Sequence, residues 1–303
     1  MKKTTLTLLT AAILLAGCNQ YDKTRTGLVY KITKSGSNEK LKNGQFIKFD
    51  LEYKVPPKDS VLTSSYGRVP GYLVIDTAKA PGHNFLEVIT KCAAGDRIEF
   101  SMSVDTLKKM GKIQYDNIFH PRDMIAGRVD IRKVFTSQQE ASDDLTKEQA
   151  AEKQREIKEL QDFTAKKGIK TQSTPSGALV EVRFAGDAQK ADSGKQIKVM
   201  YKGTFLNGKV FDSNMDKNGS NNQPLTVVVG TNGVIQGMDE AFHFFGKGGK
   251  GTMYIPAMLA YGQNGSAPVI GPWANLVFDI EVVDVGTPTP PATQPAMGAP
   301  QKK

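Results

Sequence analysis

The stretch MDEAFHFFGKGGKGTMYIPA, residues 238–257, contains a short helical pattern, a glycine turn and a strand, in that order. Residues 85–104, FLEVITKCAAGDRIEFSMSV, follow the same order about 150 residues earlier in the chain. Similar segments that recur at a constant offset indicate a duplicated unit. We therefore expect this chain to contain two copies of one fold.

Two further pairs of segments keep this order. LKNGQFIKFDL (41–51) lies over ADSGKQIKVMY (191–201), and both copies end in an alternating strand, GRVDIRKV (127–134) and LVFDIEVV (276–283). Apolar and polar residues alternate in these segments, as is typical of half-buried strands, and each copy has one short helical pattern. The sequence predicts an α+β protein with two domains, each a curved antiparallel β-sheet with one short packed helix.

A charged segment of strong helix formers, residues 142–167, separates the two copies. Thr146 and Gln149 fit a capping box, and Gly168 fits a helix stop. We expect a linker helix that rests on one domain, although its thin apolar stripe is also compatible with a dimer contact. The stripe consists of Ile157, Leu160 and Phe163.

The N-terminus has two lysines, an apolar run too short to span a bilayer, and small residues before Cys18. This order resembles a bacterial lipoprotein signal, in which Cys18 is acylated and becomes the mature N-terminus. We expect a protein of the bacterial cell envelope, held on the outer membrane by lipid and facing the periplasm or the outside. The expected segments are a signal peptide (1–17), a tether (18–26), the first domain (27–136), the linker helix (137–168), the second domain (169–286) and a disordered Pro-rich tail (287–303).

The formal charge is +9, but the lysines are spread along the chain, and no dense basic block carries interleaved aromatic residues. Nucleic-acid binding is therefore not expected. Cys92 is the only cysteine besides Cys18, and its apolar surroundings in the sequence predict a buried, inert thiol.

Several motifs suggest sites that their context does not support. GKGGKG (246–251) fits a phosphate-binding pattern, but a nucleotide site needs a strand before it and a helix after it, and here that order is reversed. The glycines are expected to end a helix and turn the chain. Asp239 and Glu240 are expected to offset a helix dipole. The isolated histidines suit no zinc site, so no metal and no cofactor are expected; they are His83, His120 and His243.

Residues 194–285 resemble the FKBP-type peptidyl-prolyl isomerases along their whole length. Four segments carry five separated motifs in the family's order and nearly its spacing. They are VMYKGTFLNGKVFDSN (199–214), PLTVVVGTNGVIQGMDEAF (224–242), YIPAMLAYGQNG (254–265) and ANLVFDIEVVDV (274–285).

The resemblance implies a site without a nucleophile or a metal, in which an apolar pocket holds a proline ring. It assigns the pocket lining to Tyr201, Phe211, Ile270 and Phe278. It also implies that the main-chain N–H of Ile235 and the hydroxyl of Tyr261 each donate a hydrogen bond to a substrate carbonyl. The carboxylate of Asp212 would lie near the twisting amide and could also accept a hydrogen bond from Tyr201. Further substrate contacts are expected from Leu225, Val234, Met238 and Val269. Each position is by itself also compatible with an ordinary core role.

Some residues depart from the family pattern. Met238 stands where Trp is common, and Leu225 where an aromatic residue is usual. Segment 214–223 is longer and more polar than typical, and the loop 262–273 has unusual residues at Ser266 and Gly271. Trp273 is expected to anchor this loop, with a rim for clients as the alternative. Since Met is smaller and more flexible than Trp, the pocket is expected to be looser.

The first copy lacks the implied site residues. Leu51 lies over Tyr201, and Leu62 and Thr63 lie over Phe211 and Asp212. A degenerate domain of this kind would serve dimerisation, client contact or spacing from the membrane.

The sequence as a whole predicts a lipid-anchored prolyl isomerase that assists the folding of proline-containing envelope or secreted proteins. The alternative is a chaperone or binding module with the same fold and little or no isomerase activity. A nucleotide-dependent enzyme would depend on GKGGKG alone.

Overall fold

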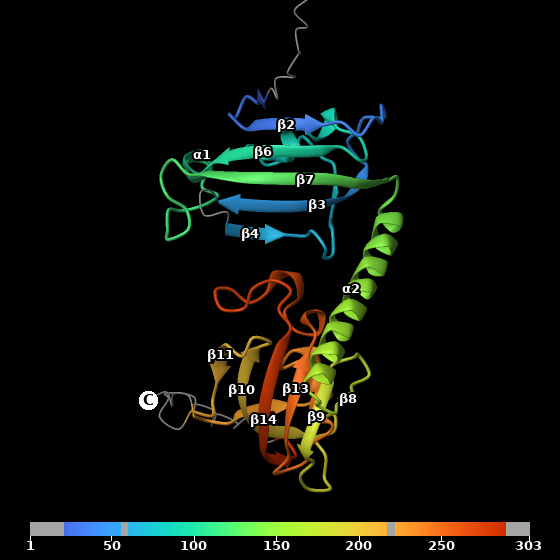
Figure 1. Ribbon diagram of the computed structural model, residues 1–303, viewed down its shortest axis with the longest axis vertical. Helices are drawn as coiled ribbons and strands as arrows, with labels where there is room; N and C mark the ends of the chain where they lie inside the picture. Colours follow the sequence, from blue (N-terminus) through green and yellow to red (C-terminus); the bar gives the residue numbers. More distant parts are fainter. Residues whose placement is uncertain (1–20, 56–59, 217–221, 289–303) are drawn as a thin grey trace, which may run out of the picture. The chain divides into compact units, whose positions relative to one another are not determined.

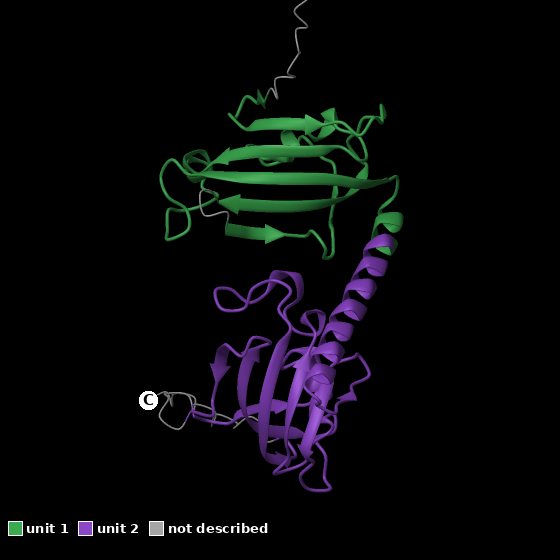
Figure 2. Cartoon of the chain, in the orientation of Figure 1, with its two compact units in different colours: residues 1–143 green, residues 144–303 purple. Residues whose placement is uncertain are grey.

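The computed structural model describes residues 21–55, 60–216 and 222–288. The chain divides into two compact units, residues 1–143 (unit 1) and residues 144–303 (unit 2), shown in Figure 2. None of the helices in the described part is long and apolar enough to cross a bilayer. Cys18 and most of the Pro-rich tail lie outside the described residues.

Each unit contains one seven-stranded antiparallel sheet. The strands of unit 1 are β1 (Asp22–Lys23), β2 (Val29–Thr33), β3 (Phe46–Val55), β4 (Ser60–Ser64), β5 (Gly71–Val74), β6 (Arg97–Ser103) and β7 (Met124–Phe135). Those of unit 2 are β8 (Gln172–Ser173), β9 (Leu179–Phe184), β10 (Gln196–Phe205), β11 (Val210–Ser213), β12 (Leu225–Val228), β13 (Lys250–Ile255) and β14 (Leu276–Gly286). Asp22 and Lys23 pair with Tyr30 and Val29. Part of the segment expected to be a tether therefore belongs to the sheet, as β1.

The order of the strands is the same in both sheets. It runs β1-β2-β6-β7-β3-β4 in unit 1 and β8-β9-β13-β14-β10-β11 in unit 2, and β5 and β12 pair with β3 and β10 (Figure 1). This shared topology confirms the predicted duplication and the α+β fold. It also makes residues comparable position by position across the two units.

The short helices differ between the units. In unit 2, α3 (Gln236–Phe242) packs on the sheet, followed by the 3-10 helices η3 (Ala257–Leu259) and η4 (Gly262–Asn264). In unit 1, the predicted helix is two 3-10 helices, η1 (Phe85–Glu87) and η2 (Ile89–Lys91), and the α-helix α1 (Val104–Lys109) follows β6. Three successive β-branched residues (88–90) disfavour a continuous α-helix there.

The long helix α2 (Gln138–Lys166) begins well before the predicted capping box, so Thr146 lies inside the helix and that prediction is wrong. The side chain of Ser137 instead accepts the N–H of Glu140 at 3.2 Å, and the Glu140 carboxylate accepts the N–H of Thr136. This is the same Ser/Thr-x-x-Glu spacing, nine residues earlier in the chain. The helix ends at the predicted place, where Gly168 has a φ of 70°.

α2 packs on unit 2 through its apolar stripe. Leu160 is fully buried against Leu179 and Tyr254, and the rings of Phe163 and Tyr254 lie 6.2 Å apart. A Cβ on Gly177 would overlap Ile157, so a glycine there lets the turn approach the helix closely. Figure 1 shows this part of α2 beside β9 and β13.

Candidate active site

Strand β10 is the centre of the candidate site in unit 2. On one side it pairs with β14; on the other it pairs first with β12, up to Val199, and then with β11, from Lys202 onward. The change of partner leaves main-chain groups of β10 without a strand beside them. Such groups are costly when buried, unless another polar group takes the place of the missing strand.

The side chain of Asn214 takes that place. Its Oδ1 accepts the N–H of Tyr201 at 2.5 Å, and its Nδ2 donates to the carbonyls of Val199 and Gln223 at 3.2 and 3.0 Å. The Asn214 N–H donates to the Tyr201 carbonyl at 3.0 Å, and the residue is 1% exposed. Asn214 thus fixes the main chain of β10 at the start of the site.

Aromatic rings from β10, β11 and β14 meet over one glycine. The ring of Phe278 lies 5.5 Å from that of Phe211 and 6.1 Å from that of Tyr201, both in edge contacts. A Cβ on Gly203 would lie 2.6 Å from the Phe211 ring and 3.1 Å from the Phe278 ring. Gly203 therefore lets the rings lie directly on the strand. The sequence analysis missed this residue, although a glycine inside a strand often marks such a close approach.

Tyr201 and Asp212 form the polar edge of this aromatic cluster. The Tyr201 hydroxyl donates to Oδ2 of Asp212 at 2.5 Å, the contact expected from the sequence. Burial and this hydrogen bond raise the pKa of Tyr201 above its ordinary value, and the nearby Tyr261 adds to the effect. The Tyr201 hydroxyl is therefore protonated at neutral pH, and Asp212 is the exposed acceptor beside it.

The corner before α3 supplies a free main-chain donor. The carbonyl of Ile235 accepts the N–H groups of Met238 and Asp239 at 3.0 and 3.1 Å and so begins the helix. Within the described residues, the Ile235 N–H itself donates no hydrogen bond. Val234 and Ile235 are half-buried on the apolar core, so this N–H lies at the edge of that core.

The loop between β13 and β14, residues 256–275, carries the remaining predicted residues. Ile270 is 7% exposed in the core, whereas Tyr261 is 41% and Val269 55% exposed. Ser266 and Ile270 exchange main-chain hydrogen bonds, which hold Val269 at a hairpin tip. The N–H of Trp273 donates to the carbonyl of Gly262 at 2.9 Å, so Trp273 closes the loop through its main chain.

The structure brings most of the predicted site residues into one apolar cluster. Met238, Ile270 and Phe278 are buried in it, and the partly buried residues packed on it are Tyr201, Phe211, Leu225, Val234 and Ile235. Asp212 joins the cluster through Tyr201, and Tyr261 and Val269 lie on the loop that contributes Ile270. The arrangement offers an apolar surface with one free N–H, one carboxylate and one exposed tyrosine.

The competing motifs have structural roles. The helix α3 precedes GKGGKG and β13 begins within it at Lys250, and a Cβ on Gly246 would overlap the carbonyl of Asp187. The carboxylate of Asp239 accepts the N–H of Gly230 at 2.9 Å, and Glu240 accepts the N–H of Ser176 at 2.9 Å. No three potential metal ligands gather among the described residues.

The thiol of Cys92 is fully buried, and burial raises its pKa to about 12. This agrees with the inert thiol expected from the sequence, because the reactive form of a cysteine is the thiolate.

Unit 1 places different residues at the corresponding positions. Strand pairing puts Leu51 where unit 2 has Tyr201, and Thr63 where it has Asp212. Tyr53 occupies the position of Gly203, and Gly127 that of Phe278.

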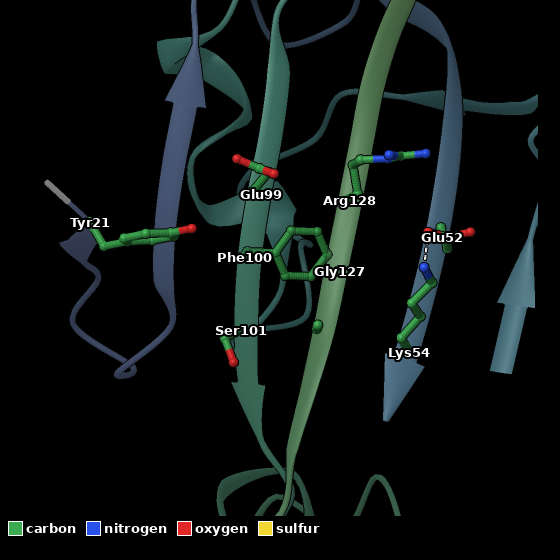
Figure 3. Close-up of a pocket in the computed structure, with 9 residues that line it drawn as sticks. Tyr21, Glu52, Lys54, Glu99, Phe100, Ser101, Gly127 and Arg128 are labelled. Carbon is green, nitrogen blue, oxygen red and sulfur yellow. Dashed lines mark ion pairs between the residues drawn. The ribbon is translucent and has the colours of Figure 1, made fainter. Parts of the chain in front are cut away.

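The ring of Phe100 covers Gly127, where a Cβ would overlap it, and Tyr53 makes an edge contact with Phe100 at 5.9 Å. Figure 3 shows Phe100 and Gly127 on adjacent strands, with Arg128, Lys54 and Glu99 around them in a shallow pocket. This pocket has charged side chains of both signs. Glu52 and Lys54 alternate along β3 with Leu51 and Tyr53, so they lie on the opposite face of the strand.

Comparisons with known proteins point to one family. The model of the family "FKBP-type peptidyl-prolyl cis-trans isomerase" matches residues 187–283. A probable FKBP-type peptidyl-prolyl cis-trans isomerase of Haemophilus influenzae is 33% identical over 220 residues, 68% of this chain and 88% of the relative. The probable isomerase FkpA of Neisseria meningitidis serogroup B is 37% identical over 138 residues, 45% of this chain, and the match spans about half (48%) of that relative.

A crystal structure of a peptidyl-prolyl cis-trans isomerase from Pseudomonas syringae pv. tomato is 28% identical to this chain. The match covers 44% of this chain and 96% of that one, with a TM-score of 0.37.

Proposed function

Because the chain belongs to the FKBP-type peptidyl-prolyl cis-trans isomerases, we propose that unit 2 carries the catalytic site and that unit 1 has lost it. The observation that carries the assignment to unit 2 is the Tyr201–Asp212 pair at the edge of the ring cluster of Phe211 and Phe278. Unit 1 has Leu51 and Thr63 in place of that pair.

The proposed reaction breaks no bond, so it needs no nucleophile. Rotation about an X–Pro amide has a barrier of roughly 18–20 kcal/mol because resonance keeps the amide planar. The site must favour the twisted amide over both planar forms. The planar amide is more dipolar than the twisted one, so a water-poor apolar surface disfavours it, and about 4 kcal/mol of such preference gives a thousandfold acceleration.

Each residue has a role in this scheme. The proline ring lies on Phe211, Phe278 and Ile270, and the free N–H of Ile235 binds a carbonyl of the substrate. The exposed Tyr261 hydroxyl binds a second carbonyl, and Asp212 lies beside the twisting amide. Leu225, Met238, Val234 and Val269 complete the apolar surface around these groups.

An exchange assay on the full chain tests this proposal. NMR exchange spectroscopy on an X–Pro peptide should show faster cis–trans interconversion with the wild-type protein. A correctly folded protein that leaves the exchange rate unchanged contradicts the catalytic assignment. Tyr261→Phe is expected to slow catalysis by about tenfold, because a carbonyl of the substrate then loses its donor.

The chaperone alternative has one observation in its favour. Met238 is 4% exposed on the core face where the family commonly has Trp, and a flexible methionine specifies a ligand less well. An aggregation assay with an unfolded protein separates the two functions. Suppression of aggregation without peptide exchange favours the binding module.

The cellular setting is part of the same proposal. We propose that a lipid on Cys18 holds the protein on an envelope membrane, where proline-containing envelope or secreted polypeptides are its clients. Support comes from the basic, apolar and small-residue order before Cys18. Cys18→Ala should move the protein from the membrane fraction to the soluble fraction, and a variant that stays in the membrane fraction contradicts the lipid anchor.

A further inference from the structure

The linker helix α2 is joined to the active-site loop by two carboxylates. Glu156, which is fully buried, accepts the N–H of Met258 on its Oε2 at 2.8 Å. Glu159 lies one turn of the helix nearer to its C-terminus and accepts from Nδ2 of Asn275 at 3.2 Å. Met258 and Asn275 lie near the two ends of the loop 256–275.

These hydrogen bonds give acceptors to the first main-chain N–H groups of η3. The first N–H groups of a helix have no partner within it and need acceptors from elsewhere. The N–H of Ala257 donates to Oδ1 of Asn275 at 2.9 Å, and the N–H of Met258 donates to Glu156. Asn275, which is 7% exposed, therefore links the start of the loop to its end and to Glu159.

The loop held in this way carries catalytic side chains. Tyr261 follows the end of η3 by two residues, and Ile270 returns from the hairpin tip into the core. A displacement of Met258 therefore moves Tyr261 with it. Catalysis by orientation is sensitive to small displacements of the groups that bind the substrate.

We propose that Glu156 and Glu159 of α2 are positioning residues for the isomerase site and set the place of Tyr261 through Met258 and Asn275. Neither residue touches the substrate. This role of α2 rests on the proposed isomerase function of unit 2, and it makes the helix part of the active site's support in addition to its role as a linker.

The chain contains a natural reporter for this proposal, because Trp273 is its only tryptophan and closes the same loop. The test uses the full chain and measures kcat/KM for an X–Pro peptide together with acrylamide quenching of Trp273. Glu156→Ala is expected to lower kcat/KM by about tenfold and to make Trp273 more accessible to the quencher. Glu156→Gln keeps an acceptor for Met258 and should restore kcat/KM to within about twofold of the wild type.

A matched control lies on the same helix. Asp162 makes an exposed pair with Lys158 at 3.0 Å, so Asp162→Ala should change neither kcat/KM nor the quenching of Trp273. If Glu156→Ala does not fold, Glu159→Ala takes its place, because Glu159 is exposed and loses only the bond to Asn275.

A folded Glu156→Ala or Glu159→Ala protein with wild-type kcat/KM and wild-type quenching overturns the proposal. If the wild-type protein shows no isomerase activity, the proposed function fails, and the quenching of Trp273 still decides whether α2 positions the loop.

Discussion

The two units have the same strand order, yet only unit 2 keeps the Tyr201–Asp212 pair at the edge of a ring cluster. In unit 2 the glycine is on β10, as Gly203, and the ring is on β14, as Phe278. In unit 1 the aromatic residue is on β3, as Tyr53, and the glycine is on β7, as Gly127. Each strand pair therefore has one aromatic residue opposite one glycine, but the two residues have changed strands between the units. The position of the glycine, and with it the space on which a proline ring would lie in unit 2, is thus on the other strand in unit 1.

The two units make the same main-chain hydrogen bonds at Leu51 and Tyr201, although the two side chains differ. In unit 1, Leu51 donates its N–H to Oγ of Ser65 at 2.9 Å, and Ser65 donates its N–H to the Leu51 carbonyl at 2.9 Å. Tyr201 and Asn214 make the same exchange in unit 2. The fold therefore depends on a polar residue that replaces a missing strand neighbour, and the site depends on a separate set of rings.

The substitution Gly203→Tyr should have the largest effect, because it places the unit 1 residue in the unit proposed to be active. Its side chain would meet the rings of Phe211 and Phe278, and we expect kcat/KM to fall by about a thousandfold, or about 4 kcal/mol. The reverse substitution in unit 1, Tyr53→Gly, should leave kcat/KM unchanged. Peptide exchange measured on both variants checks the comparison, and a loss of activity in Tyr53→Gly would contradict it.

Asn214 and Ser65, the residues that replace a missing strand neighbour, should differ in how much they stabilise their units. Asn214→Ala removes three side-chain hydrogen bonds and should lower the free energy of unfolding by about 3 kcal/mol, because buried main-chain groups lose their partners. Ser65→Ala removes the 2.9 Å bond from the N–H of Leu51 and a long bond to Asp50 at 3.5 Å, and should cost about 1 kcal/mol. Urea unfolding measures both, with Trp273 fluorescence following unit 2 and circular dichroism following the whole chain. Equal costs would mean that Asn214 has no greater role than Ser65.

Asp212→Thr copies Thr63 of unit 1 and should lower kcat/KM by about tenfold, because the carboxylate proposed to lie beside the amide is lost. The domain should stay folded, since Asp212 is exposed. Peptide exchange and the melting temperature are the measurements. A melting temperature that falls sharply would show that Asp212 acts on the fold instead.

Tyr201→Phe should have the smallest effect on stability, and that effect should depend on pH. The pKa of Tyr201 is raised by burial and by Asp212, so its stabilising contribution is complete below the ordinary tyrosine pKa of about 10 and is lost as pH rises above it. The variant should therefore melt below the wild type at pH 7, and the difference should shrink toward pH 11. Melting followed by Trp273 fluorescence tests this, and a difference independent of pH would exclude the raised pKa as the cause.

The sequence predicted the features that depend on local patterns. Alternating residues and the constant offset between copies predicted two equivalent sheets, because strand periodicity is a property of neighbouring residues. The Tyr201–Asp212 contact was expected from the resemblance to a known family, and the two residues lie on the paired strands β10 and β11.

Features that depend on distant pairing were not predicted. Asn214 replaces a strand only because β11 and β12 both pair with β10, and a single sequence does not give that register. Glu156 had no signal within a charged helix, since its partner Met258 is about 100 residues away. The capping box of α2 was misplaced because two Ser/Thr-x-x-Glu/Gln patterns occur in succession, and tertiary contacts decide between them.

The pairing of β10 with β14 also determines when unit 2 can fold. Gln196 pairs with Gly286, so the central ladder closes a loop of about 90 residues, and such non-local sheets fold in milliseconds to seconds. β7 completes the sheet of unit 1 at Phe135, whereas β14 is the last strand of the described chain. During synthesis from the N-terminus, unit 1 can complete its sheet while β10 still lacks its partner. The unit proposed to catalyse a slow folding step in other proteins can thus complete its own sheet only after unit 1 has done so.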